Sequence, residues 1–262
     1  MKVLVKLGGS LVDAPESCDR LAGELAAAAR DGISLVVVHG GGKQMTRFLA
    51  ERGIESRFIN GLRVTTPETI DAVLKVFAGS VNHELVAALI RAGALAVGLT
   101  GIDACLVEAE ALDPALGAVG KPVRSNPELL NLLCGRKYVP VIACVAGDRR
   151  GRIYNVNADQ MAAACAASFG ADVLLFLTDV EGVMDSSKQI LAQLTSAECE
   201  GLIAQGVATG GMQAKLIAAS NALEKGVRRV IIAPGAEMDI VRRALAGENV
   251  GTRLIQESLR NA

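Results

Sequence analysis

Short apolar runs alternate with amphipathic helical patterns along most of the chain. The apolar runs, which are typical of strands buried on both faces of a sheet, lie at residues 3–7, 35–38, 95–99, 139–145, 173–177 and 230–233. Helical patterns lie at residues 16–30, 42–52 and 127–133, two more helices are expected between 66 and 91, and others begin near Asn157, Thr195 and Thr209. This order implies right-handed crossovers and a mostly parallel sheet. The pattern therefore predicts an α/β fold, a three-layer αβα sandwich with a mostly parallel open sheet.

The middle of the chain departs from this alternation. Between Cys105 and Ser125, short extended pieces are broken by Gly117, Gly120 and Pro122. Glycine and proline at such spacing interrupt strands and favour turns. We therefore expect one or two β-hairpins here.

The far end of the chain is predicted to close the sheet, with residues 251–254 forming a short edge strand. No internal repeat or low-complexity linker marks a domain boundary. We divide the chain into two lobes, an N-terminal lobe of residues 1–171 and a C-terminal lobe of residues 172–262.

Three of the predicted helices begin with capping signals. Thr66 precedes Pro67, and proline fits the first position of a helix. Asn157 and Thr195 are each followed three residues later by Gln or Glu, the spacing of a capping box. Asp159 lies in the first turn of its helix, where the helix dipole favours a negative charge.

Composition limits the classes of protein to consider. Hydrophobic residues make up 51% of the chain but aromatic residues only 3%, so the core must be aliphatic. A net charge of −1 argues against nucleic-acid binding by bulk electrostatics. The first residues carry no signal-peptide pattern, and no uninterrupted apolar run is long enough to span a bilayer. We expect a cytoplasmic protein with no membrane or nucleic-acid partner.

Cysteine and histidine are sparse and scattered. The six cysteines include no C-x-x-C pair, and with two histidines the chain has no zinc-like cluster. Cys144 and Cys165 lie in apolar surroundings and are predicted to be core residues. A reaction that needs a general base at neutral pH has few candidates here.

Two strands are followed by glycines and a lysine. Lys6-Leu7-Gly8-Gly9 ends the first strand, and glycines leave backbone amides uncovered beside the lysine charge, an arrangement that suits phosphate. His39-Gly40-Gly41-Gly42-Lys43 ends the second strand and begins a helix, whose N-terminus adds partial positive charge. Each could also be a simple turn. Gln44 departs from the Walker A pattern and Met45 from G-x-G-x-x-G, which weakens a dinucleotide-binding hypothesis.

Three more residues have a bland and a functional interpretation. Arg63 is either a surface arginine or a bidentate clamp on a substrate carboxylate. Asp159 is either a helix N-terminal acid or part of a site together with Asn155, which flanks the same turn. Lys215, one turn into a helix that opens with glycines, could equally be a surface lysine.

Taken together, these segments resemble the amino acid kinase family, and most closely its members that phosphorylate N-acetyl-L-glutamate. The resemblance covers essentially the whole chain in order, and its segments N-G-L-R-V-T (60–65) and N-V-N-A-D-Q (155–160) are specific to those members. The remaining matching segments are Lys6-Leu7-Gly8-Gly9, His39-Gly40-Gly41-Gly42, Thr178-Asp179-Val180-Glu181-Gly182-Val183 and Gly211-Met212-x-x-Lys215. One departure is the stretch before Lys215, where family members often carry an acidic residue and proline.

The resemblance implies a role for each matching position. Lys6 and Lys215 would stabilise the transferring phosphoryl group, and Asp159 would hold both lysines. Amides of Gly8, Gly9, Gly41 and Gly42 would bind the phosphates and the attacking carboxylate, while Arg63 and Asn155 would bind the substrate's α-carboxylate and amide region. ATP would be held by Asp179, Val180, Glu181, Gly182, Val183, Met184, Val207, Ala208 and Thr209. The resemblance assigns acyl-substrate binding and dimerisation to residues 1–171 and ATP binding to residues 172–262.

The resemblance also implies ATP with nucleotide-borne Mg²⁺ as the phosphoryl donor, since no protein metal ligand is evident. Because the chain begins at its first strand, without the N-terminal helix of arginine-inhibited hexameric members, it implies a homodimer without arginine feedback. There are alternatives to this function. One is a kinase for aminoadipate or glutamate bound to a carrier protein, and another is a non-catalytic ligand sensor of the same fold. A dehydrogenase is a third and weaker alternative.

The expected chemistry agrees with the residues at hand. A side-chain carboxylate has a pKa of about 4.3, so it is already ionised at neutral pH and needs no general base. The obstacle is repulsion from the phosphoryl group, roughly 4 kcal/mol for unit charges about 4 Å apart at an effective dielectric near 20. Two lysines, glycine amides and Mg²⁺ would offset it, so catalysis would consist of positioning and electrostatics.

Overall fold

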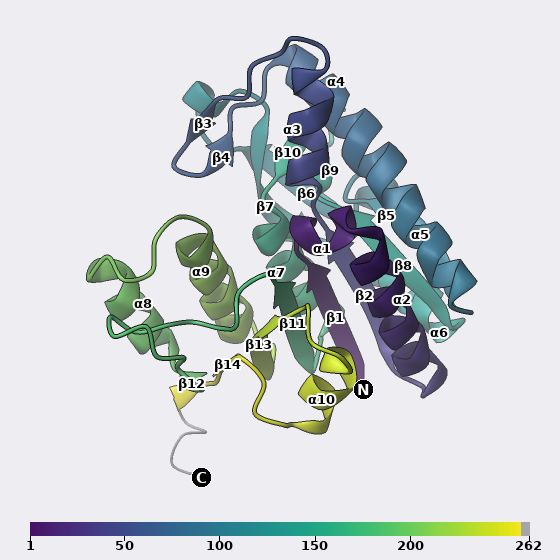
Figure 1. Ribbon diagram of the computed structural model, residues 1–262. Helices are drawn as coiled ribbons and strands as arrows, with labels where there is room; N and C mark the ends of the chain where they lie inside the picture. Colours follow the sequence, from purple (N-terminus) through teal and green to yellow (C-terminus); the bar gives the residue numbers. More distant parts are fainter. Residues whose placement is uncertain (258–262) are drawn as a thin grey trace.

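An eight-stranded sheet runs through the centre of the protein (Figure 1). The computed structural model describes residues 1–257. The strands, from one edge to the other, are β12 (Gln193–Leu194), β14 (Thr252–Leu254), β13 (Arg229–Pro234), β11 (Val173–Thr178), β1 (Lys2–Leu7), β2 (Ser34–His39), β8 (Tyr138–Ala143) and β5 (Leu95–Thr100). From β13 to β5 all neighbours are parallel, as the alternating pattern predicted.

The C-terminal strand is not at the edge of the sheet. β14 runs antiparallel to β13 and pairs on its other side with β12. The prediction of an edge strand at residues 251–254 is therefore wrong, because β12 occupies the edge. β12 has only two residues, too few to show a period-two pattern in the sequence.

Helices cover both faces of the sheet (Figure 1). One face packs against α2 (Pro15–Arg30), α5 (Asn82–Arg91) and α10 (Ile240–Ala246). The other packs against α6 (Glu128–Gly135), α7 (Ala158–Phe169) and α9 (Gly210–Glu224), with α8 (Ser196–Ala204) lying on α9. This is the predicted αβα sandwich, and the fold class is confirmed.

A small closed barrel lies beside the sheet. It contains β10 (Ile153–Val156), β7 (Val119–Ser125), β6 (Val107–Ala111) and β9 (Val145–Gly147). Short 3₁₀ turns at Asp103–Cys105 and Pro114–Leu116 precede β6 and β7, respectively. β6 and β7 form the expected antiparallel pair. The predicted single strand at 139–145 is instead divided, because the chain leaves the sheet at Cys144 and joins the barrel.

Shorter elements surround the carboxyl ends of β1 and β2. They are α1 (Gly9–Asp13), α3 (Gly42–Ala50) and the hairpin of β3 (Phe58–Ile59) with β4 (Leu62–Arg63). The hairpin turns through Asn60 and Gly61, both with positive φ, as a tight two-residue turn requires.

A single long helix replaces the two expected between residues 66 and 91. It consists of α4 (Pro67–Val73), a π-helical segment (Leu74–Val81) and α5. Within residues 1–257 it is the one helix long and apolar enough to cross a membrane by length and composition. Asp71, Lys75 and Glu84 are exposed on it, and its apolar side packs on α2 and β5, which is typical of a core helix.

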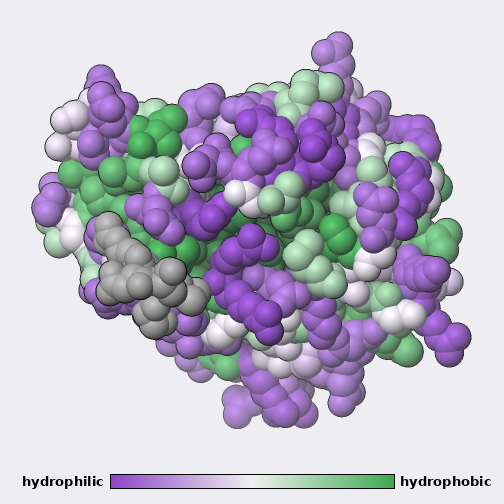
Figure 2. Space-filling model, turned by 90° about the horizontal axis from the view of Figure 1, so that it is seen from below, coloured by the Kyte–Doolittle hydropathy of each residue, from purple (hydrophilic) through white to green (hydrophobic). Residues whose placement is uncertain are grey.

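The core is aliphatic, as the composition predicted. Val3, Leu4 and Val5 of the central strand are fully buried, and Cys144 and Cys165 are core residues as expected. Hydrophilic residues cover most of the face seen in Figure 2, with hydrophobic residues showing between them in separate areas.

The sheet register brings the two glycine segments together. Leu7, at the end of β1, lies opposite His39 at the end of β2 and Leu177 near the end of β11. The segments that follow therefore leave the sheet side by side at its carboxyl edge. Ligands of open parallel sheets bind at this edge.

Candidate active site

Two lysines and one aspartate form a buried cluster. The Nζ atom of Lys6 lies 2.8 Å from Oδ1 of Asp159, and the Nζ atom of Lys215 lies 3.2 Å from Oδ2 and 3.3 Å from Oδ1. The three residues are only 8%, 7% and 6% exposed. The structure thus brings together residues that lie far apart in the sequence.

Each member of the cluster is placed by a different element of the fold. Lys6 lies on β1, next to Phe176 of β11, and the Lys215 ammonium lies 5.3 Å from the centre of the Phe176 ring. Asp159 lies in the first turn of α7, which packs on β1, and α9 carries Lys215 against α7. The predicted cap of α7 is present: Oδ1 of Asn157 accepts hydrogen bonds from the Asp159 and Gln160 amides at 2.9 and 3.2 Å.

The charges of the cluster do not balance. Burial by itself raises the pKa of Asp159, but the Lys6 and Lys215 charges and hydrogen bonds outweigh it and hold that pKa below its usual value. Burial, together with the Lys6 charge, lowers the pKa of Lys215. One carboxylate between two ammonium groups leaves a net positive site, which suits an anionic ligand.

The cluster opens into a cavity of about 640 Å³. It is lined by Lys6, Gly8, Gly9, Ser10, Gly40, Gly41, Gly42, Lys43, Thr46, Phe58, Arg63, Ala158, Asp159, Thr178, Asp179, Val180, Gly211, Met212 and Lys215. All predicted catalytic residues, and all predicted substrate-binding residues except Asn155, are in this set.

The glycines are needed where the chain is crowded. A Cβ atom on Gly8 would lie 3.1 Å from the Leu177 carbonyl oxygen, and one on Gly41 would lie 2.9 Å from a ring carbon of Phe77. A Cβ on Gly9 would lie 3.4 Å from the Gly42 nitrogen, so the two glycine segments are in close contact. Bare backbone therefore forms one wall of the cavity, beside the N-terminus of α3.

Arg63 is buried and held in place. Its guanidinium donates hydrogen bonds to Thr46 Oγ1 at 2.9 Å, to the Gly42 carbonyl at 3.2 Å and to Ser56 Oγ, and it lies 4.7 Å from the Phe58 ring centre. Three of its five N–H donors are used in these bonds, which leaves donors for a carboxylate. The surface interpretation of this arginine is thereby excluded.

Asn155 does not line the cavity but is connected to Arg63 through Thr65. Its Nδ2 donates to Thr65 Oγ1 at 3.1 Å, and the Thr65 hydroxyl donates to the Arg63 carbonyl at 2.9 Å. Asn155 is thus connected to the strand that carries Arg63, but it does not line the cavity as described.

The residues predicted to hold a nucleotide divide into two groups. Asp179 and Val180 line the cavity, whereas Glu181, Gly182, Val183, Met184, Val207, Ala208 and Thr209 do not. Gly182 and Val183 pack against β14, where the Val183 amide donates to Thr252 Oγ1 at 2.8 Å. Thr209 is exposed and precedes α9.

The sequence patterns missed several lining residues, among them Ser10, Thr46 and Phe58. Ser10 directly follows the first glycine segment. Thr46 lies one turn into α3, the helix that follows the second glycine segment. These two could have been found by proximity. Phe58 lines the cavity because the β3–β4 hairpin lies beside it. No local sequence pattern indicates this position of the hairpin.

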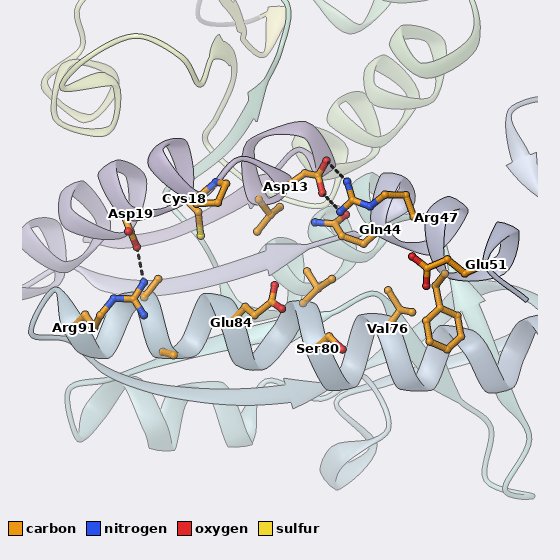
Figure 3. A pocket seen from close by; sticks show the side chains of 16 residues that line it. Asp13, Cys18, Asp19, Gln44, Arg47, Glu51, Val76, Ser80, Glu84 and Arg91 are labelled. Carbon is orange, nitrogen blue, oxygen red and sulfur yellow. Dashed lines mark hydrogen bonds and ion pairs between the residues drawn. The ribbon is translucent and has the colours of Figure 1, made fainter.

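A second cavity, of about 510 Å³, lies between α1, α2, α3 and the long helix (Figure 3). Ion pairs cross it, Arg47 with Asp13 and Arg91 with Asp19. None of the predicted site residues lines it. Each of these arginines is paired with one carboxylate, whereas in the lysine–aspartate cluster two ammonium groups share one carboxylate.

Comparison with known proteins identifies the family. The model of the amino acid kinase family matches residues 1–234. The chain belongs to this family. An acetylglutamate kinase of Solibacter usitatus is 66% identical over 97% of this chain and 99% of its own length. Acetylglutamate kinases of Acidobacterium capsulatum (46% identity, 89% and 91% coverage) and Koribacter versatilis (41%, 91% and 92%) are also similar. The family resemblance found in the sequence is confirmed.

Solved structures of other proteins share the fold. The smu.665 protein of Streptococcus mutans has a TM-score of 0.85 at 26% identity, covering 98% of this chain and 99% of that one. A carbamate kinase of Giardia lamblia bound to AMP-PNP has a TM-score of 0.73 at 17% identity, with 98% of both chains covered. At that identity the likeness shows the fold alone.

Proposed function

We propose that this amino acid kinase transfers the γ-phosphoryl group of ATP to the side-chain carboxylate of N-acetyl-L-glutamate, giving N-acetyl-L-glutamyl 5-phosphate and ADP in arginine biosynthesis. One observation carries the proposal: the Lys6–Asp159–Lys215 cluster opens into a glycine-lined cavity. The acetylglutamate kinases that match nearly the whole chain support the substrate. They do not favour a carrier-protein-bound substrate or a silent sensor.

The cluster supplies the electrostatics of the reaction. Lys6 and Lys215 stabilise the negative charge of the transferring phosphoryl group, and Asp159 holds both ammonium groups without cancelling them. Amides of Gly9, Gly41 and Gly42 donate to phosphate and carboxylate oxygens. The amide of Gly8 does not take the expected role, because it donates to the Leu177 carbonyl at 2.9 Å. The acceptor carboxylate is already ionised, so no side chain has to remove a proton.

Arg63 and Asn155 bind the acyl substrate. The free donors of Arg63 pair with the α-carboxylate, and its contacts with Thr46 and Phe58 fix its direction. Asn155 reaches the substrate amide only if it leaves Thr65, a change that substrate binding would have to drive.

The nucleotide occupies the side of the cavity formed by Asp179, Val180 and Lys215, with residues 181–184 and 207–209 closing around it. The lysines and bare amides there fit a polyphosphate. Among residues 1–257, no group of three or more His, Cys, Asp or Glu side chains could hold a metal ion. Mg²⁺ would be held by the nucleotide and would supply positive charge to its phosphates.

The protein forms a homodimer in the cytoplasm through the free edge of its sheet. β5 is an edge strand, paired with β8 on one side and with no strand on the other among the described residues. Leu95 is 59% exposed there, and Ile90 of the adjacent helix 55%. An unprotected apolar edge of this kind favours pairing with a second chain. We also propose the division into an N-terminal lobe (1–171) and a C-terminal lobe (172–262). The last five residues of the second lobe (258–262) lie outside the described residues.

Trapping with hydroxylamine tests the reaction, since an acyl phosphate yields a hydroxamate. The purified chain is incubated with MgATP and N-acetyl-L-glutamate, L-glutamate, N-acetyl-L-aspartate or L-2-aminoadipate. We expect hydroxamate and equimolar ADP with N-acetyl-L-glutamate only. Turnover of another carboxylate without turnover of N-acetyl-L-glutamate would contradict the assigned substrate.

A further inference from the structure

His39 is buried behind the second glycine segment and makes two hydrogen bonds. It is the last residue of β2 and is 0% exposed. Its Nδ1 atom lies 2.7 Å from the carbonyl oxygen of Gly40, and its Nε2 atom lies 2.9 Å from Nδ2 of Asn82. The Asn82 amide nitrogen also donates to the Val141 carbonyl at 2.9 Å.

These contacts allow one arrangement of protons. The Val141 carbonyl can only accept, so the amide group of Asn82 must present its nitrogen to both Val141 and His39. Nε2 of His39 then accepts a hydrogen bond from Asn82, so the proton of the neutral ring is on Nδ1. The Nδ1–H group donates to the Gly40 carbonyl. Burial lowers the pKa of His39 to about 4, which keeps the ring neutral as this arrangement requires.

The bond to Gly40 also sets the direction of the next amide. In a trans peptide, the carbonyl of Gly40 and the N–H of Gly41 point in opposite directions. The carbonyl points at the His39 ring, so the Gly41 N–H points away from it. Gly40 and Gly41 line the cavity, and among the described residues no backbone carbonyl accepts from the Gly41 amide.

The π-helical segment explains how Asn82 reaches the imidazole. Bonds in a π-helix join residues five apart, so Phe77 and Asn82 come to the same side of the helix, where an α-helix would separate them. Phe77 packs against Gly41 and Asn82 bonds His39. One face of this segment therefore supports the glycine loop at two points.

We propose that His39 and Asn82 are positioning residues: their hydrogen bonds hold the Gly40–Gly41 peptide so that the Gly41 amide is aimed at the transferring phosphoryl group. This inference rests on the proposed function for its target. The arrangement of the imidazole, however, can be tested without any substrate.

The first test observes the ring nitrogens of the wild-type chain by ¹⁵N NMR with labelled histidine. The chain has two histidines, and a His83→Gln variant assigns the signals; His83 is exposed. We expect His39 to show a protonated Nδ1 and an unprotonated Nε2, unchanged from pH 8 to pH 6. A protonated Nε2, or exchange between tautomers, would overturn the inference whatever the enzyme's substrate.

The second test separates the two ring nitrogens by substitution. His39→Asn keeps a donor near the position of Nδ1, whereas His39→Gln keeps only a group near Nε2. We expect His39→Gln to lower kcat about 100-fold with little change in KM, and His39→Asn to recover most of that loss. Asn82→Leu should also lower kcat, and His83→Gln should not.

Equal activity of His39→Asn and His39→Gln, with both folded by thermal melting, would overturn the positioning role. Losses of kcat that are proportional to the decrease in melting temperature would also overturn it. If the wild type makes no hydroxamate at all, the proposed function fails instead, and the NMR result still decides the tautomer.

Discussion

Replacing Asp159 by asparagine removes the negative charge between two buried ammonium groups. The Nζ atoms of Lys6 and Lys215 lie 2.8 and 3.3 Å from the same Oδ1 atom. They are therefore at most about 6 Å apart, where unit charges repel by roughly 3 kcal/mol at an effective dielectric near 20. Asp159 offsets this repulsion in the wild type. Without its charge, the Lys6 repulsion and burial act together, so we expect the pKa of Lys215 to fall further in the variant.

The assay is ADP release from MgATP and N-acetyl-L-glutamate between pH 6 and pH 9. We expect the wild-type kcat to be nearly flat at the acid end, and the variant kcat to be at least about 100-fold lower at pH 8. The loss should be smaller at the acid end of this range, because a lysine with a lowered pKa is more fully protonated there. A variant with kcat within about threefold of wild type and the same pH profile would refute the role given to Asp159.

Stability gives an independent measurement on the same variant. Removing one partner of a buried ion pair costs about 3–5 kcal/mol, so urea unfolding at pH 7 should show a loss of this order. The folded-state pKa of Asp159 is lowered, so its stabilising effect is complete above the unfolded-state value of about 4 and is lost as the pH falls further. The difference between wild type and variant should therefore shrink below about pH 4.

Three further predictions concern other parts of the site and the sheet edge. Lys6→Met and Lys215→Met should each lower kcat by about 1000-fold while the protein stays folded, with exposed Lys75→Met as the unaffected control; normal turnover in either would remove that lysine from the mechanism. Gly41→Ala places a methyl group 2.9 Å from a phenylalanine ring carbon, so it should shift the glycine loop and lower kcat about tenfold or more, and unchanged kinetics would contradict the tight packing. Leu95→Asp should turn a dimer into a monomer in sedimentation, and a wild-type monomer would contradict the proposed edge pairing.

Local patterns were sufficient for the parts of the fold that are continuous in sequence. The aliphatic runs of β1, β2 and β11 are buried on both faces, so their identity does not depend on a neighbour's register. Both glycine segments follow such strands directly, and parallel neighbours bring strand ends to one edge. The lysine–aspartate cluster was expected from the family resemblance, and the residues alone left each of its members open.

Contacts between distant segments could not be predicted from the sequence. The barrel joins β9 and β10, each too short for a periodic signal, to β6 and β7. Asn82 lies 43 residues from His39 and carries no motif, and its partnership appears only when a π-helical segment turns it toward the glycine loop. The chain's exit from the sheet at Cys144 is likewise a tertiary effect.

The cluster's third charge has a consequence for synthesis of the chain. A nascent chain that has emerged only to residue 171 contains Lys6 and Asp159, whose charges cancel, and it lacks Lys215. The surplus positive charge of this cluster therefore arises only when α9 docks, late in translation. The cluster of a partly made enzyme should therefore attract nucleotide phosphates less strongly than the cluster of the finished enzyme.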